Sequence, residues 1–246
     1  MLAPGYRGSL EMNPIRSVIL WSFGLIFFGI FSTIAILLTY IIPLRILDPF
    51  IQASLKLLFK VMFIKVKVKG KIDFDSSKTY LLMSNHVSLF DVPLLKAYIP
   101  IYFKGVEAHH QFKWPFYGWL VTRMGTIPIE RHNIYASMRS IKKATKQIKQ
   151  GTSIAILPEG TRTLTGKIQP FKKMPFMLAK KAGVDIIPIG LSGLFKLKPK
   201  GSWHITPSTI TIRFGEAIKS GIVNDLSMEE LRDKVFESIK GLVTEP

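Results

Sequence analysis

Residues 80–93 read YLLMSNHVSLFDVP, and the fold class that the sequence predicts depends on this stretch. Its first four residues are apolar without alternation, as expected of a strand that is buried on both faces. His86, Ser88 and Asp91 follow this strand within eight residues. Three interpretations of these side chains are open: a catalytic site, a metal site, or polar residues that only begin the next helix.

Apolar strands alternate with helical patterns through residues 65–246. We expect strands at 66–69, 79–84, 99–103, 126–129, 153–157, 186–191 and 209–214. We expect helices near 88–97, 113–123, 135–149, 171–182 and 227–242. This alternation predicts one α/β domain over 65–246, with a mostly parallel, mixed sheet flanked by helices.

The amino-terminal region has a different composition. Residues 17–44 are 28 consecutive residues without a charge. As a helix this segment would be roughly 42 Å long at ~1.5 Å per residue, longer than the ~30 Å hydrocarbon core of a bilayer requires. It is too long for a signal peptide and lacks the small-residue cleavage site, so we expect it to remain in the protein and to enter a membrane.

The next segment, 46–65, has the pattern of an amphipathic helix, with Gln52, Lys56 and Lys60 on its polar face. A basic amphipathic helix beside a very apolar one predicts that residues 1–64 form a membrane-embedded helical pair seated in one leaflet. A single membrane span is the alternative. The excess of basic residues after the apolar segment favours the cytoplasmic face of the cell membrane for the remaining domain.

The chain of 246 residues carries a net charge of +18 and has no cysteine. The absence of cysteine excludes disulfides, thiolate metal ligands and a cysteine nucleophile. The basic charge predicts a polyanionic partner, which could be nucleic acid, a phosphorylated small molecule or an anionic membrane surface. We expect no nucleic acid partner, because no RNA-binding aromatic motif, zinc module or helix-turn-helix pattern is present. A non-catalytic membrane protein that binds anionic lipid is an alternative function.

His86 and Asp91 are five residues apart, so on a continuous helix their side chains would point about 140° away from each other. They can meet if the chain turns after the strand and Asp91 lies in the first turn of the next helix. The carboxylate could then orient the imidazole as a general base, which is how hydrolytic triads work.

Ser88 and the other histidines support weaker predictions. Ser88 lies only two residues from His86 and is not surrounded by the glycines of a nucleophile elbow. We therefore interpret it as a residue that caps the helix start and not as a nucleophile. His109 and His110 are adjacent, which is a poor spacing for metal ligands, so no metal site is expected.

Three further segments accompany NHVSLFD at 85–91. They are GTIPIER at 125–131, LPEGTRT at 157–163 and IIPIG at 186–190, and each follows or ends a predicted strand. In this order and spacing the four segments resemble the four blocks of the glycerolipid acyltransferase family, whose bacterial prototype is 1-acylglycerol-3-phosphate acyltransferase. The resemblance covers about residues 65–215.

The resemblance implies a catalytic pair, His86 and Asp91, in which the imidazole deprotonates a lipid hydroxyl. It also implies a set of residues that bind the phosphate and glycerol of the acceptor: Lys104, Arg131, Glu159, Gly160, Thr161 and Arg162. Arginine can hold a phosphate through two parallel hydrogen bonds, and glycine lets the backbone approach a ligand closely. Glu159 is expected to accept from a glycerol hydroxyl or to fix the arginine.

The reaction implied by the resemblance moves a fatty acyl group from an acyl thioester to the sn-2 hydroxyl of 1-acyl-glycerol-3-phosphate and gives phosphatidic acid in phospholipid biosynthesis. The expected partners are lysophosphatidic acid, acyl carrier protein or coenzyme A as carrier of the acyl group, and anionic membrane lipids. No metal or other cofactor is implied, and backbone N–H groups near Gly160 are candidates to bind the oxyanion. Glycerol 3-phosphate or another lysophospholipid is the alternative acceptor.

Three positions depart from the family pattern. Glu130 stands where the second block usually has aspartate, and Leu157 where the third block more often has phenylalanine. Met174 stands where a glycine is usual, and it is expected to change the shape of the acyl site. The aromatic residues of 113–121 are expected at a membrane interface, in an acyl groove, or in an ordinary aromatic core.

Overall fold

A computed structural model describes residues 13–70, 74–75, 77–130 and 134–244. The strands are β1 (Lys65–Lys69), β2 (Tyr80–Ser84), β3 (Phe103–Ala108), β4 (Ile127–Ile129), β5 (Ser153–Ile156), β6 (Asp185–Ser192) and β7 (Thr209–Phe214). The helices are α1 (Pro14–Leu38), α2 (Leu44–Val61), α3 (Asp91–Tyr98), α4 (Tyr117–Arg123), α5 (Ile134–Lys149), α6 (Lys173–Ala182), α7 (Leu194–Leu197), α8 (Ser220–Asp225) and α9 (Met228–Leu242). A short 3-10 helix, η2 (His109–Lys113), follows β3.

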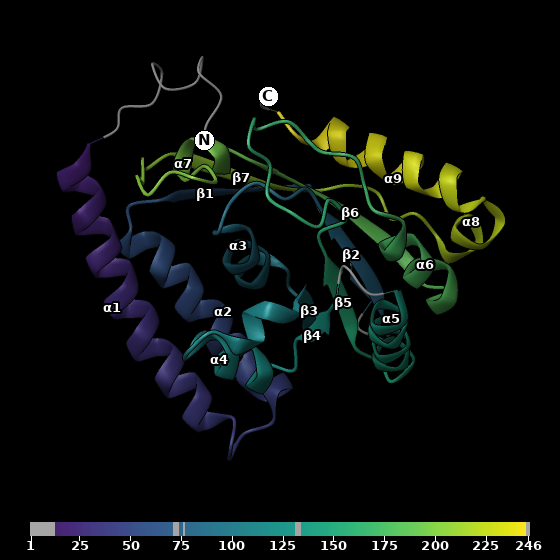
Figure 1. Ribbon diagram of the computed structural model, residues 1–246, viewed down its shortest axis with the longest axis horizontal. Coiled ribbons are helices and arrows are strands. Elements are labelled where there is room, and N and C mark those ends of the chain that lie inside the picture. The colour runs from purple at the N-terminus through teal and green to yellow at the C-terminus, as the bar shows by residue number, and fades with distance from the viewer. Residues whose placement is uncertain (1–12, 71–73, 76, 131–133, 245–246) are drawn as a thin grey trace.

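The strands form one seven-stranded sheet in the order β1-β7-β6-β2-β5-β3-β4. Every neighbouring pair is parallel except β6 and β7, which are antiparallel. The predicted mixed, mostly parallel sheet is therefore confirmed. Helices α1 to α4 lie on one side of the sheet and α5, α6, α8 and α9 on the other (Figure 1).

Strand β2 lies at the centre of the sheet and is buried on both faces. All five of its residues are buried, as the unbroken apolar run predicts. Leu82 belongs to the hydrophobic core beneath α2 and α3, whereas Leu81 and Met83 belong to the core beneath α5, α6 and α9. The carboxyl end of β2 therefore lies between the two helical layers, and residues 84–90 continue from that end.

The third strand lies four residues later than the sequence predicts. The apolar run 99–103 was expected as the strand, but β3 begins only at Phe103. Ile99 is instead the residue that ends α3, with its N–H bonded to Leu95 O, and its side chain is buried in the core. Pro100 follows and has no N–H for a sheet. The apolar character of this segment comes from the packing of a helix end.

Helix α1 lies along α2 and is held at both ends by the α/β domain (Figure 1). Near its start, Trp21 Nε1 donates to Trp203 O at 2.6 Å. Just after its end, the Arg123 guanidinium donates to Thr39 O and Thr39 Oγ1, both at 2.9 Å. Residues of α1 and α2 also share one hydrophobic core with β2 and α3. The amino-terminal helices are thus packed on the sheet domain and do not extend away from it.

The outer face of α1 is apolar and exposed. Among the described residues, α1 is the one helix long and apolar enough to cross a membrane. Large apolar side chains are exposed along its length: Ile15, Val18, Ile19, Phe23, Leu25, Ile26, Ile30, Ile34 and Leu37. An exposed apolar surface of this size is typical of a contact with lipid or with another protein.

A buried ion pair joins α2 to α3. Lys96 Nζ contacts Asp48 Oδ1, and the two side chains are only 15% and 5% exposed. The ammonium also lies 4.7 Å from the centre of the Phe103 ring. Burial lowers the pKa of Lys96, and the charge of Asp48 opposes this effect. Because α3 begins with Asp91, this pair helps to fix the helix that carries Asp91.

We expect Asp48→Ala to lower the free energy of unfolding by about 3–5 kcal/mol, because it leaves the Lys96 ammonium buried without its partner. The measurement is denaturant unfolding of the purified protein in detergent. The matched control is Glu237→Ala, which breaks the exposed ion pair between Glu237 and Lys240 on α9 and should change stability very little. Similar small effects from both substitutions would contradict the structural role of the buried pair.

Candidate active site

The turn after β2 brings His86 and Asp91 together. His86 Nδ1 lies 2.7 Å from Asp91 Oδ2. Asp91 is the first residue of α3 and is fully buried, and its carboxylate also accepts the N–H groups of Val87 at 2.6 Å and Ser88 at 3.0 Å. The turn between strand and helix that the five-residue spacing required is therefore present.

These contacts orient the imidazole of His86. Because Nδ1 is next to a carboxylate, it carries the proton and donates to Asp91. The unprotonated Nε2 is then available as a base. The imidazole remains 17% exposed while Asp91 is fully covered, so a substrate can approach the histidine but not the aspartate. The pair is arranged for proton abstraction by Nε2.

Ser88 does not cap α3 with its side chain, so that prediction is wrong. Its hydroxyl is buried and donates to Lys198 O at 2.8 Å. The residue at the N-cap position is Phe90, which makes no side-chain cap. The Asp91 carboxylate accepts the backbone N–H groups before the helix and leaves the Ser88 hydroxyl free for a distant loop. That hydroxyl points to a carbonyl group and not to the imidazole.

Glu159 joins the loop after β5 to the histidine. Its Oε1 accepts the His86 N–H at 2.6 Å, and its Oε2 accepts the Gln169 N–H at 2.8 Å. Burial raises the pKa of Glu159 to about 7, although hydrogen bonds from Gln169 and His86 act in the opposite direction. Both oxygens are used by the protein itself, so the carboxylate positions the backbone of His86. No sequence pattern pointed to Gln169.

The residues after Glu159 form a tight turn. Gly160 has a φ of +71°, which suits glycine, and its N–H donates to Leu157 O at 3.0 Å. The N–H of Gly160 is therefore used within the turn, although this region was expected to bind an oxyanion. Thr161 Oγ1 accepts from Lys200 Nζ at 3.0 Å. Thr163 N–H donates to His86 O at 3.0 Å, which holds the turn beside the histidine.

Three cations gather next to the His86–Asp91 pair. Lys198 is buried, and its carbonyl group is the acceptor of the Ser88 hydroxyl. Burial lowers the pKa of Lys198, and the charge of Arg162 lowers it further. Lys200 Nζ lies 3.5 Å from Arg162 O. We call Arg162, Lys198 and Lys200 the cation cluster. An anion bound here would relieve the repulsion among its members.

The sequence identified only one member of the cation cluster. Lys198 and Lys200 lie in the segment KLKPKG at 196–201, which has no motif and is one of several lysine-rich stretches. Their position beside Arg162 arises from the path of the chain after α7. Nothing in the sequence distinguishes them from the other lysines.

Lys104 lies apart from these groups. It was expected at the end of a strand, but it is the second residue of β3 and lies near the amino end of that strand. Lys104 Nζ donates to Gln147 Oε1 at 2.7 Å, and Gln147 belongs to α5 on the side of the sheet opposite α3. The cause is the four-residue displacement of β3. Arg131, the other expected phosphate ligand, lies outside the described residues.

Metal ligands are not clustered in the described parts of the chain. No group of three or more His, Asp or Glu side chains is placed there to hold a metal ion. His109 and His110 are both exposed in η2.

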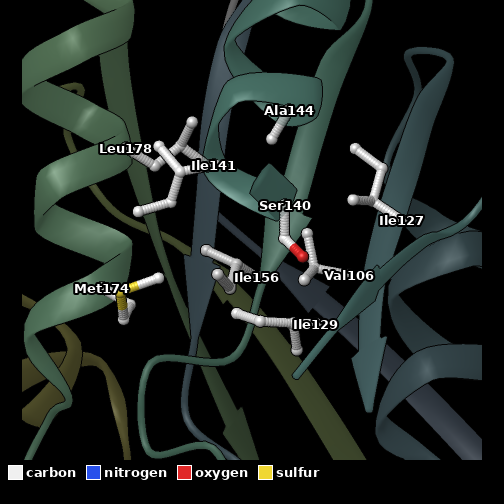
Figure 2. Close-up of a pocket in the computed structure, with 9 residues that line it drawn as sticks. All are labelled: Val106, Ile127, Ile129, Ser140, Ile141, Ala144, Ile156, Met174 and Leu178. Carbon is white, nitrogen blue, oxygen red and sulfur yellow. The ribbon is translucent and has the colours of Figure 1, made fainter. Parts of the chain in front are cut away.

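An apolar pocket lies between the sheet and helices α5 and α6 (Figure 2). Its lining side chains come from β3, β4, β5, α5 and α6: Val106, Ile127, Ile129, Ser140, Ile141, Ala144, Ile156, Met174 and Leu178. The Ser140 hydroxyl is the polar group of this lining, and it donates to Pro128 O at 2.7 Å. Met174 thus faces a pocket on the side of the sheet opposite α3, away from the His86–Asp91 pair.

Comparison with known proteins identifies the family. The family model described as "Acyltransferase" matches residues 65–192, which are just over half of the chain and include β1 to β6 and the His86–Asp91 pair. The chain belongs to the acyltransferase family. The resemblance noted in the sequence is thereby confirmed.

Named relatives are similar over most of this chain. A chloroplastic 1-acyl-sn-glycerol-3-phosphate acyltransferase of Brassica napus is 33% identical over 72% of this chain and 52% of its own length. A chloroplastic protein of the same name from Arabidopsis thaliana is 32% identical over 72% of this chain and 50% of its own. The chain therefore spans about half the length of these curated relatives.

A solved structure shares the fold. The crystal structure of the 1-acyl-sn-glycerophosphate acyltransferase PlsC from Thermotoga maritima superposes with a TM-score of 0.81. The match covers 93% of this chain and 95% of the other at 24% sequence identity. It extends over nearly the whole chain, so the acyltransferase fold here includes more than the residues that match the family model.

Proposed function

We propose that this protein is a 1-acylglycerol-3-phosphate O-acyltransferase that moves a fatty acyl group from an acyl thioester to lysophosphatidic acid and forms phosphatidic acid. The observation that carries the proposal is the bond between His86 Nδ1 and the buried Asp91, which leaves Nε2 available as a base. The cation cluster beside this pair suits an acceptor that carries a phosphate. The names of the similar proteins specify the same acceptor.

The proposed reaction needs no covalent enzyme intermediate. His86 Nε2 removes the proton of the sn-2 hydroxyl, and that oxygen attacks the carbonyl carbon of the thioester. The tetrahedral intermediate collapses, the carbon–sulfur bond breaks, and the thiolate takes the proton from His86. The products are the ester and a free thiol. Asp91 stabilises the imidazolium that exists between the two proton transfers.

The phosphate of the acceptor is placed at the cation cluster. The guanidinium of Arg162 can hold phosphate oxygens through two hydrogen bonds, and Lys200 adds a charge that is attached to the same loop by Thr161. Glycerol 3-phosphate and other lysophospholipids also carry a phosphate. Parallel assays with each of these compounds therefore distinguish lysophosphatidic acid from the other acceptors.

The acyl donor is a thioester of acyl carrier protein or of coenzyme A, and both carriers are polyanions. Exposed basic side chains line the outer face of α5: Arg139, Lys142, Lys143, Lys146 and Lys149. Such a surface attracts either donor by long-range electrostatics. The same assay with each thioester separates the two.

We also propose that α1 and α2 sit in one leaflet of the cell membrane, with the catalytic domain on the cytoplasmic face. Both ends of α1 are bonded to the same domain, so α1 cannot cross a bilayer while these contacts persist. Trp114, Phe116 and Trp119 are also exposed, and α4 contacts α1. Aromatic side chains at this position suit the lipid–water interface. Substrate and product could then remain in the bilayer.

The function is tested by thiol release from acyl-coenzyme A or acyl carrier protein in lysophosphatidate micelles. Release should require the acceptor, and His86→Ala and Asp91→Ala should lower kcat by a factor of about 100 to 10,000, because the first removes the general base and the second removes the carboxylate that orients it. His110→Ala is the matched control and should be fully active. Near-normal turnover by folded His86→Ala would contradict the mechanism, and a wild-type protein inactive with every acceptor would contradict the function.

The role of the cation cluster is tested by acceptor kinetics. We expect Arg162→Ala and Lys200→Ala to raise the KM for lysophosphatidate about tenfold, because each removes a charge-assisted contact with phosphate. The KM for the acyl donor should not change. Lys104→Ala is the control, since its side chain is bonded to α5 on the other side of the sheet. An equal rise in KM from Lys104→Ala would show that general charge, and not this site, binds the acceptor.

The seating of α1 is tested by labelling single cysteines in sealed vesicles, which is direct because the natural chain has none. Ile15→Cys lies in the first turn of α1 and Ile41→Cys lies just beyond its end, and both should react with an impermeant maleimide from the same side of the membrane. Glu237→Cys on α9 marks the side of the catalytic domain. Labelling of positions 15 and 41 from opposite sides would show that the helix spans the bilayer.

A further inference from the structure

A half-buried carboxylate that lies in none of the four sequence blocks is found on the side of the sheet that carries α3. Glu107 belongs to β3, and Tyr117 Oη lies 2.8 Å from its Oε2 and 3.0 Å from its Oε1. The tyrosine hydroxyl donates to the carboxylate. Tyr117 is the first residue of α4, so the two partners come from different elements. The function proposed above assigns no role to either residue.

The strand geometry places Glu107 on the side of the sheet that carries α3. Successive side chains in a strand point to opposite faces. Val106 lines the pocket beneath α5 and α6, and Lys104 is bonded to α5, so Glu107 points to the other face. Only β5 separates β3 from β2 in the sheet. Glu107 lies near the carboxyl end of β3, as His86 lies beyond the carboxyl end of β2.

The charges of Glu107 and His86 interact. Burial raises the pKa of Glu107, whereas the hydrogen bond from Tyr117 and the nearby imidazole of His86 lower it. The interaction must be mutual, because a charge that favours an anion is itself favoured by that anion.

A strained segment holds Tyr117 in this position. Phe116 has a φ of +62° and a ψ of −56°, and the Tyr117 N–H donates to Pro115 O at 2.6 Å. These values describe a γ-turn of the rare, strained kind. Gly118 follows, and a Cβ there would lie only 2.1 Å from Phe112 O. Strained backbone of this kind persists only where the surrounding structure enforces it, and it often occurs at functional sites.

We propose that Glu107 is a positioning residue that presents a fixed negative charge to His86 and stabilises the imidazolium formed during acyl transfer, while Tyr117 holds the carboxylate in place. This inference rests on the function proposed above. Asp91 already occupies Nδ1, so Glu107 acts through its charge and accepts no proton from the imidazole. The acceptor proton still passes from Nε2 to the leaving thiolate.

The charges around His86 explain why a third carboxylate is useful. Asp91 faces it from α3, and Glu159 from the loop after β5. Tyr117 approaches from α4 and carries no charge, since burial raises the pKa of its hydroxyl. Arg162 and Lys198 have the opposite effect, because their positive charges disfavour an imidazolium. The negative charge of Glu107 offsets the effect of these cations on His86. The cations themselves are needed to bind the acceptor phosphate.

The first test does not depend on enzyme activity. The imidazole of His86 is titrated by NMR in the full-length protein in detergent, and its signal is assigned by its loss in His86→Ala. Glu107→Gln removes the charge but keeps the size and an acceptor for Tyr117, and it should move the His86 titration to lower pH. Glu237→Gln, on α9, should leave the titration unchanged. An unchanged titration in Glu107→Gln would overturn the inference.

The second test is kinetic. Glu107→Gln should lower kcat about tenfold with no change in the KM for lysophosphatidate. The acidic limb of its pH–rate profile should move to lower pH, so the loss should become smaller as the pH falls. Tyr117→Phe should cause a smaller shift in the same direction, because it releases the carboxylate without removing it. Glu107→Asp should recover part of the lost kcat, which a purely structural role would not predict.

The outcomes separate this inference from the proposed function. The role of Glu107 alone would be overturned if the wild-type protein transfers acyl groups and the pH–rate profile of Glu107→Gln superimposes on the wild-type profile. A raised acceptor KM with an unshifted profile would also overturn it, because Glu107 would then act in binding. If the wild type transfers no acyl group, the proposed function fails, and the NMR titration alone decides whether Glu107 controls the charge of His86.

Discussion

The hydrogen bonds of the buried Asp91 carboxylate are the interaction on which the candidate site depends. A fully buried charge is unfavourable unless several donors surround it. Here the donors are the imidazole of His86 and the backbone N–H groups of Val87 and Ser88. The same carboxylate therefore closes the turn after β2, begins α3 and orients the imidazole. Loss of this one group would disturb the local fold and the chemistry together.

The rest of the site is arranged around this turn by the parallel sheet. The carboxyl ends of β2 and β5 lie side by side, so the loops that follow them meet. Glu159 makes the connection through the backbone of His86, and Thr163 makes a second one. The ion pair between Lys96 and Asp48 extends the assembly to α2. The proposed membrane helices and the candidate base are thus parts of one packed unit.

Charge is distributed in this unit in a way that fits acyl transfer to a phosphorylated acceptor. In the proposed reaction, cations are needed to bind the phosphate, but they disfavour the imidazolium that proton transfer to His86 would create. The carboxylate of Asp91 would act in the opposite direction, and its complete burial makes it effective because little water screens it. A site built for this chemistry must therefore hold both signs close together in fixed positions. Strained backbone at Phe116 is consistent with such a requirement.

The sequence by itself determined the α/β class, the central buried strand, the turn that joins His86 to Asp91, and the family. These features depend on local patterns, because a strand buried on both faces and a five-residue spacing can each be recognised within one segment. Only the tertiary structure decided which distant residues join the pair. It displaced β3 by four residues and placed Lys104 beside α5, and it brought Lys198 and Lys200, from a segment without a motif, beside the loop that carries Arg162. Contacts between distant segments depend on how whole layers pack and on strand register, which no single segment of the sequence records.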